Sequence, residues 1–179
     1  MAVTQATLAD RLRASIRDIP DFPKPGILFK DITPVLADPA LFRDTIAALA
    51  NQWRAEKPDV VVGIESRGFI FGAPLALALE TAFIPIRKPG KLPYKTMRVE
   101  YALEYGTDAL EAHQDAVAGG QRVLIVDDVL ATGGTAAAAA KLVSQLGGDV
   151  IGAAFLIELG FLNGRERLDT LQTRALITY

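Results

Sequence analysis

The sequence predicts an α/β protein with a mostly parallel central sheet flanked by helices. Half of the 179 residues are apolar, which suffices for a sizeable core in a single domain spanning residues 1–179. Short apolar runs, typical of strands buried on both faces, alternate with segments of helical periodicity. Their spacing suits right-handed crossovers between parallel strands, so a doubly covered sheet is expected.

The chain is expected to begin with a helix. Its apolar positions recur at helical spacing and are Leu8, Leu12, Ile16 and Ile19. Pro20 ends this pattern, and the following PDFPKPG segment is expected to be irregular or extended because of its prolines and glycine. A stiff loop therefore follows the first helix.

A strand–loop–helix unit comes next. A second helix is predicted from about Pro39 to Trp53, with Asp38 as its N-cap. The continuous apolar run Asp59–Ile64 then predicts a buried strand, and Phe69–Leu79 again has the pattern of a helix.

The second half of the chain repeats this alternation. An Ala-rich helix is predicted over Thr135–Leu146, ending at Gly147 and Gly148. The further strands are predicted at Thr81–Arg87, Arg122–Val126, Val150–Ile157 and Thr173–Ile177. Lys91–Asp108 is polar and aromatic, so we interpret it as a hairpin-like excursion that closes over a site.

Composition excludes several classes of function. The 19 basic and 21 acidic residues leave a net charge of -2 without a basic run, so neither DNA nor RNA is the expected partner. Cysteine is absent and His113 is the single histidine, so a catalytic metal would need oxygen ligands. With no signal-peptide core and no long uncharged apolar run, the protein is expected to be cytoplasmic and not membrane-bound.

One segment, VLIVDDVLATGGT, combines two features that suit a phosphorylated sugar. Asp127 and Asp128 follow the apolar run Val123–Val126, at the strand end where α/β sheets bind ligands. The next segment, which we call the phosphate loop, opens a helix whose N–H groups can surround a phosphate, and it consists of Ala131, Thr132, Gly133, Gly134 and Thr135. It lacks the lysine of a Walker loop and the G-x-G-x-x-G of dinucleotide folds. The alternative is that these residues only end a strand and turn the chain.

This segment resembles the donor-binding signature of the type I phosphoribosyltransferases, in which two acidic residues precede a T-G-G-T loop. Further stretches resemble the adenine phosphoribosyltransferases, and they are Asp21–Leu36, Ile64–Gly72, Ile86–Pro93 and Val99–Gly106. The resemblance covers nearly the whole chain. It implies the type I phosphoribosyltransferase fold, with an N-terminal helix and base-binding hood over about residues 1–36 and a flexible lid over about residues 91–108.

The resemblance also implies roles in binding 5-phosphoribosyl 1-diphosphate. The phosphate loop would hold the 5-phosphate, while Asp127 and Asp128 would contact the ribose hydroxyls directly or through Mg²⁺ held by substrate and water. Ser66 and Arg67 follow a predicted strand, so they should enter the same crevice, where Arg67 can bind the diphosphate bidentately. A surface arginine held by Glu65 is the alternative.

Three cations, Arg87, Lys88 and Lys91, flank Pro89 and Gly90. On charge alone they form a solvated turn. In the family the cations of this stretch contact diphosphate, and the arginine reaches toward the neighbouring subunit's site, which implies a homodimer.

Base recognition rests on the hood and on the lid. By resemblance, the ring of Phe29 stacks on adenine, and the backbone of Leu28 and Lys30 bonds its edge. Alternatively, Phe29 plugs the core together with Phe22. In the lid, Tyr105 would cover the donor, and Glu104 would be a catalytic acid or base near the purine, although by itself Glu104 is an ordinary exposed carboxylate. Arg67 would be the second catalytic residue.

The resemblance therefore implies an enzyme of purine salvage. It would transfer phosphoribosyl to adenine with Mg²⁺ as cofactor, giving AMP and diphosphate. One alternative is a phosphoribosyltransferase for 6-oxopurines such as xanthine or hypoxanthine, since the donor site would be shared. Another is a regulatory nucleic-acid-binding protein with this fold, which would need a basic face or an added DNA-binding domain.

Overall fold

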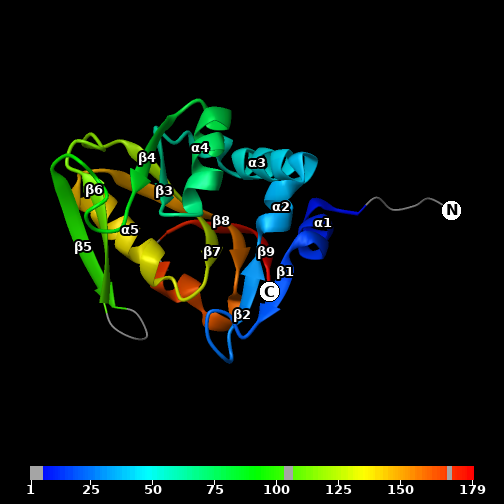
Figure 1. Ribbon diagram of the computed structural model, residues 1–179. Helices are drawn as coiled ribbons and strands as arrows, with labels where there is room; N and C mark the ends of the chain where they lie inside the picture. The colour runs from blue at the N-terminus through cyan, green and yellow to red at the C-terminus, as the bar shows by residue number, and fades with distance from the viewer. Residues whose placement is uncertain (1–5, 103–106, 169–170) are drawn as a thin grey trace. The chain divides into compact units, whose positions relative to one another are not determined.

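A computed structural model describes residues 6–102, 107–168 and 171–179 (Figure 1). The chain divides into two compact units, Met1–Ala48 and Leu49–Tyr179. The strands of the larger unit's main sheet are β3 (Val60–Ile64), β4 (Ala82–Ile86), β7 (Arg122–Leu130), β8 (Asp149–Glu158) and β9 (Thr173–Thr178). They form a five-stranded parallel sheet in the order β4-β3-β7-β8-β9. The predicted α/β fold with a parallel central sheet is thereby confirmed.

Two crossover helices cover opposite faces of this sheet. Helix α4 (Gly68–Leu79) leads from β3 outward to β4, whereas α5 (Gly134–Gln145) leads from β7 in the other direction to β8. On β3, Val60 and Val62 share an apolar cluster with residues of α5. The alternate residue Gly63 contacts the Phe83 ring on the α4 side. Because right-handed crossovers in opposite directions leave a crevice where the order reverses, the ligand site is expected between β3 and β7.

A two-stranded antiparallel hairpin lies beside α5 (Figure 1), and it consists of β5 (Thr96–Ala102) and β6 (Thr107–His113). The predicted excursion is therefore a hairpin, but it extends past Asp108. The second strand was missed because its apolar residues, Ala109, Leu110 and Ala112, are few and are interrupted by Glu111. Leu110 is fully buried in the cluster that contains α5, so the hairpin is anchored in the core.

The N-terminal unit has a different local structure from the one predicted. Its elements are α1 (Leu8–Ser15), β1 (Arg17–Pro20), β2 (Leu28–Asp31), α2 (Thr33–Ala37) and the start of α3 (Pro39–Trp53). The extension of the first helix to Ile19 was wrong, because Ile16 is already extended and Ile19 pairs with Phe29 across β1 and β2. Pairing with a distant segment thus outweighs the local helical spacing. Asp38 caps α3 as predicted, accepting hydrogen bonds from the N–H of Ala40 at 2.9 Å and Leu41 at 3.0 Å.

Short 3-10 segments complete the larger unit, and they are η1 (Arg54–Glu56), η2 (Gly160–Leu162) and η3 (Gly164–Leu168). Across the part of the chain that the structure describes, the helices are all too short or too polar to cross a membrane.

Candidate active site

The predicted donor residues gather beyond β3 and along the end of β7. Ser66 and Arg67 follow β3 after Glu65, and both are exposed. The expectation that β7 stops at Val126 was wrong, since its pairing with β8 continues to Leu130. Its pairing with β3, however, ends at Val126. Asp127 is therefore the first residue of β7 that no longer pairs with β3. The strand continues along β8 because backbone pairing does not require apolar side chains.

The acidic pair forms the floor of this crevice. Asp128 is only 4% exposed, and its Oδ2 accepts a hydrogen bond from Nε of Arg67. Asp127 Oδ1 accepts from the N–H of Asp128 at 2.9 Å. Burial, together with the neighbouring carboxylate of Asp128, raises the pKa of Asp127 well above its ordinary value. Asp128 is thus held against Arg67, whereas the surroundings of Asp127 favour its neutral form.

Close backbone packing brings α4 up to this floor. A Cβ added to Gly68 would lie 2.7 Å from the carbonyl oxygen of Val126 and 3.1 Å from Asp127 Oδ1. Only glycine allows this approach, which places the first turn of α4 and the preceding Arg67 beside the acidic pair. Gly68 was not predicted as a site residue, although its position directly after Ser66 and Arg67 was a usable signal.

The phosphate loop surrounds a pocket of about 80 Å³ at the start of α5. Gly133 has φ of 79° and precedes the first residue of the 12-residue helix. Backbone N–H groups at such a helix start are suited to an anion. The pocket is lined by Asp127, Val129, Leu130, Ala131, Thr132, Gly133, Gly134, Thr135, Ala136 and Phe155. The phosphate loop and Asp127, which the sequence places close together in one segment, thus line the same cavity.

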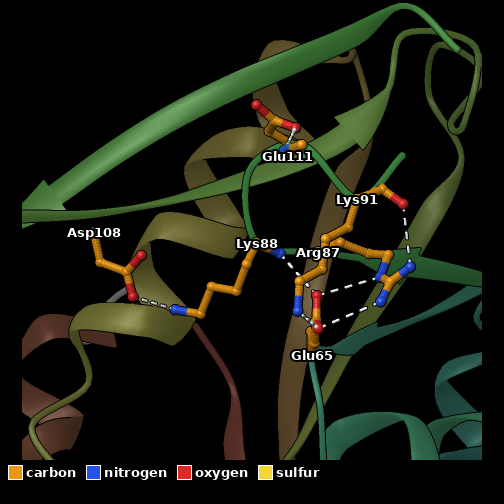
Figure 2. Close-up of polar contacts among 7 residues, drawn as sticks. Glu65, Arg87, Lys88, Lys91, Asp108 and Glu111 are labelled. Atoms are coloured by element: carbon orange, nitrogen blue, oxygen red, sulfur yellow. Dashed lines mark hydrogen bonds and ion pairs between the residues drawn. The ribbon is translucent and has the colours of Figure 1, made fainter. Parts of the chain in front are cut away.

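Glu65 accepts hydrogen bonds from the turn at residues 87–91 (Figure 2). Arg87 donates to its carboxylate from Nε at 3.2 Å and from Nη2 at 3.4 Å, and Lys91 donates from Nζ at 2.6 Å. The N–H of Lys88 adds a bond of 3.0 Å. Burial raises the pKa of Glu65, but these bonds outweigh it and lower the pKa to about 2. Glu65 therefore forms ion pairs with Arg87 and Lys91. Arg67, which could have been held by Glu65, forms an ion pair with Asp128.

The side chain of Lys88 points away from Glu65 toward the hairpin (Figure 2). Its Nζ donates to Asp108 Oδ2 and to the hydroxyl of Tyr101, the latter at 3.0 Å. Tyr101 lies 3.5 Å from the hydroxyl of Thr135 in the phosphate loop. A polar chain thus links the cations to the loop. Tyr101 and Asp108 were not among the predicted site residues, and only their place in a polar, aromatic segment hinted at them.

A second buried carboxylate fixes the turn itself. Glu111 is 8% exposed and accepts a hydrogen bond from the N–H of Gly90 at 3.1 Å. Arg87 and Glu111 also exchange backbone hydrogen bonds of 2.9 and 2.8 Å. The three cations therefore belong to an ordered turn anchored on β6.

The predicted base-binding residues lie on or beside β2 in the N-terminal unit. The Phe29 ring is half-buried and packs edge-on against Phe22, with ring centroids 5.1 Å apart. Phe22 is 50% exposed and Phe29 is not among the buried core residues, so the two rings do not plug the core. Lys30 pairs with Asp18 through Nζ at 2.6 Å, which leaves a role for its backbone unaffected. Glu104 and Tyr105 lie outside the described residues, and their roles stay predictions.

The carboxylates of the site could supply some, but not all, of the oxygen ligands of a Mg²⁺ ion. Among residues 6–102, 107–168 and 171–179, no three His, Cys, Asp or Glu side chains are grouped to hold a metal. The carboxylates of Asp127 and Asp128 offer oxygen atoms, and Mg²⁺ keeps waters and shares substrate oxygens. The residues thus fit an ion held mainly by substrate and water.

Comparison with known proteins agrees with this geometry. Residues 32–172 match the phosphoribosyl transferase domain model. The chain is 58% identical over 172 residues to adenine phosphoribosyltransferase from Anaeromyxobacter dehalogenans, covering 96% of this chain and 100% of that protein. It is 59% identical over 170 residues to the Synechocystis enzyme of the same name, covering 94% and 99%.

Solved structures of adenine phosphoribosyltransferases are also similar to this chain. The crystal structure of adenine phosphoribosyltransferase from Thermoanaerobacter pseudethanolicus has a TM-score of 0.94 and 56% identity, covering 97% of this chain and 100% of that one. The Saccharomyces cerevisiae enzyme, complexed with an imino-altritol bisphosphate and adenine, has a TM-score of 0.91 and 42% identity, covering 95% and 98%. This chain belongs to the phosphoribosyltransferase family and, within it, to the adenine phosphoribosyltransferases.

Proposed function

We propose that this protein catalyses the Mg²⁺-dependent transfer of a phosphoribosyl group from 5-phosphoribosyl 1-diphosphate to adenine, giving AMP and diphosphate in purine salvage. The observation that carries the proposal is that Asp127 lines the pocket of the phosphate loop, while the adjacent Asp128 binds Arg67. The adenine bound to the Saccharomyces cerevisiae relative supports the choice of base.

The proposed donor contacts divide along the length of the ligand. The phosphate loop takes the 5-phosphate through backbone N–H groups and the hydroxyls of Thr132 and Thr135. Asp127 and Asp128 take the ribose hydroxyls. The diphosphate is left to Arg67 and Ser66 on one side and to the cations Arg87, Lys88 and Lys91 on the other. In the described structure these cations contact protein carboxylates, so a diphosphate would compete with Glu65 and Asp108 for them.

The reaction forms a bond between an imidazole-ring nitrogen of adenine and the anomeric carbon of the donor, with inversion. The bond from that carbon to the diphosphate oxygen breaks, and its electron pair leaves with diphosphate. Bound Mg²⁺ would offset negative charge on the departing group. Arg67 and the cations at residues 87–91 add to that electrostatic stabilisation, which is often the largest contribution to catalysis.

Base selection is assigned to the hood, where Phe29 stacks on the purine and the backbone of Leu28 and Lys30 bonds its edge. An extended strand such as β2 presents C=O and N–H groups that match the acceptor and donor of an aminopurine edge. Glu104 would stabilise a proton on the other imidazole-ring nitrogen of the purine or only orient the base, and Tyr105 would cover the donor. If Glu104→Gln kept nearly full turnover, the acid/base role would be abandoned.

We also propose a cytoplasmic homodimer in which Arg87 approaches the partner's site. Two features of the larger unit support an interface on the side of the sheet that carries α4 and β4. Helix α4 is apolar around its whole circumference, and it exposes Ile70 and Leu77, the latter by 80%. Strand β4, which directly precedes Arg87, lies at the edge of the sheet.

A panel of bases tests the proposed reaction. The protein is mixed with Mg²⁺ and 5-phosphoribosyl 1-diphosphate, and adenine, hypoxanthine, guanine and xanthine are offered separately. AMP formed only with adenine is the expected result. Nucleotide from the oxopurines instead would select the 6-oxopurine alternative, and no product with any base would overturn the enzymatic function.

A further inference from the structure

We infer that the segment η3, Gly164–Leu168, positions the phosphate loop, and that the pair Glu158–Arg165 holds this segment in place. This assigns a positioning role to residues near the C-terminus. The inference rests on the proposed function, because it concerns the 5-phosphate end of the same donor site.

The carrying observation is a backbone contact between two glycines. A Cβ added to Gly164 would lie 2.1 Å from the carbonyl oxygen of Ala131 and 3.0 Å from the amide nitrogen of Gly133. A Cβ added to Gly133 would lie 2.3 Å from the carbonyl oxygen of Gly164. Side chains do not approach backbone atoms this closely. The two chain segments therefore touch directly, and both contacts fall on residues of the phosphate loop.

An ion pair between Arg165 and Glu158 holds the residue that follows Gly164. Glu158, at the end of β8 and 7% exposed, accepts from Arg165 Nε at 2.5 Å and from its Nη2 at 2.8 Å. Arg165 also donates from Nη1 to the carbonyl oxygen of Thr173 at 2.6 Å. The guanidinium of Arg165 thus joins β8 to β9, and the backbone of Arg165 directly follows Gly164. Bidentate arginine–carboxylate pairs of this kind constrain geometry strongly.

Further anchors leave the segment little freedom. Leu168, at its end, is 3% exposed and belongs to the core cluster that contains α5. Ahead of the segment, directly after β8, the N–H of Leu159 donates to the carbonyl oxygen of Leu130 at 2.9 Å, just before the phosphate loop. The loop is thus bounded by β7 on one side and by an anchored segment on the other.

Such support matters because a phosphate cradle works only if its N–H groups already point at the anion. A small displacement of binding groups weakens a contact that depends on fixed donors. The binding of adenine uses a different part of the chain. Loss of the support should therefore change donor affinity and leave adenine affinity nearly unchanged.

Gly164→Ala tests the contact, with Gly119→Ala as the matched control, since a Cβ on the exposed Gly119 meets nothing within 4 Å. We measure the KM of each substrate, the thermal midpoint, and binding of ribose 5-phosphate by calorimetry. The KM for the donor and the Kd for ribose 5-phosphate are expected to rise about tenfold, the effect of losing one charge-assisted hydrogen bond. The KM for adenine should match that of the control. Unchanged donor KM in the folded variant, or an equal rise for both substrates, overturns the inference.

Arg165→Ala and Arg165→Lys decide the matter if Gly164→Ala does not fold. Arg165→Ala should weaken ribose 5-phosphate binding, and Arg165→Lys should recover part of it by keeping one bond to Glu158. Arg43→Ala, at an arginine whose side chain is 74% exposed, is the control. Equal binding by all three variants overturns the inference. If the wild-type protein forms no nucleotide, the proposed function fails, while ribose 5-phosphate binding still tests the positioning role.

Discussion

Arg67 donates from its Nε to Oδ2 of Asp128, and this ion pair crosses the crevice between β3 and β7. The carboxylate side chain is 6% exposed, whereas the arginine side chain is 45% exposed. The buried partner therefore holds the exposed one at the entrance of the site. Asp128 has two proposed tasks, since it contacts the ribose and also orients a group that binds the diphosphate.

A double-mutant cycle on Arg67 and Asp128 tests this link. Arg67→Ala and Asp128→Asn should each raise the KM for the donor about 10- to 100-fold, as expected for hydrogen bonds to charged groups. The double variant should fall well short of the product of the two effects, because each single change already breaks the pair. Steady-state kinetics with Arg43→Ala as control measures this. Fully multiplicative effects would show that Asp128 does not act through Arg67.

Asp127→Asn is expected to stabilise the fold while weakening donor binding. Burial and then Asp128 raise the pKa of Asp127 above its ordinary value of 3.8, so the fold favours the neutral form. The stability that a raised pKa confers is present below pH 3.8 and is lost as the pH rises through the folded-state pKa. At neutral pH the neutral amide should raise the free energy of unfolding by about 1 kcal/mol, and Asn can still accept from the N–H of Asp128.

Urea denaturation of both proteins at neutral pH and below pH 3.8 measures this difference, which should vanish on the acid side. A variant that is less stable at neutral pH would contradict the burial of an unfavourable charge. Unchanged donor affinity would contradict the proposed ribose contact.

Glu65→Gln should remove an acid-sensitive part of the stability. The bonds from Lys91, Lys88 and Arg87 outweigh burial and lower the pKa of Glu65 from 4.5 to about 2. Its contribution is therefore fully present above pH 4.5 and is lost as the pH falls toward 2. Wild type should be the more stable protein at neutral pH, and the gap should close through this window. Glu166→Gln, on an exposed residue of η3, is the control. A gap that is independent of pH would refute the assignment.

Phe29→Ala should raise the KM for adenine and leave the KM for the donor unchanged. Stacking of a base on an aromatic ring contributes about 1–3 kcal/mol, which corresponds to roughly 10- to 100-fold in affinity. Phe161→Ala removes a ring that is 69% exposed and serves as control. An equal rise for both substrates would indicate damage to the fold rather than loss of a stacking partner.

Leu77→Lys should convert the proposed dimer to monomers, because it places a charge in the exposed apolar face of α4. Light scattering of the wild type and of Phe161→Ala should give the dimer mass. If the variant has the same mass as the wild type, the interface lies elsewhere. Leu77 is assigned no substrate contact, so an accompanying loss of turnover would support a contribution of the partner to the site.

Much of the fold was predictable because its signals are local. Buried parallel strands give continuous apolar runs such as Val60–Ile64, and helix starts give caps such as Asp38. Pairings between distant segments leave no such mark. Ile19 has helical spacing yet lies in a strand opposite Phe29, and β6 places Leu110 in the core from a segment with few apolar residues.

By itself, the sequence determined the α/β class, the acidic pair and the phosphate loop, since strand, carboxylates and glycines are contiguous there. Only the tertiary structure decided which groups hold these residues in position. Arg67 meets Asp128 across 61 positions, and Glu65 meets Lys91 across 26. Gly164 touches Ala131 because two independent segments end at the same edge of the sheet. Such contacts depend on where strands end in space, which no spacing within the sequence encodes.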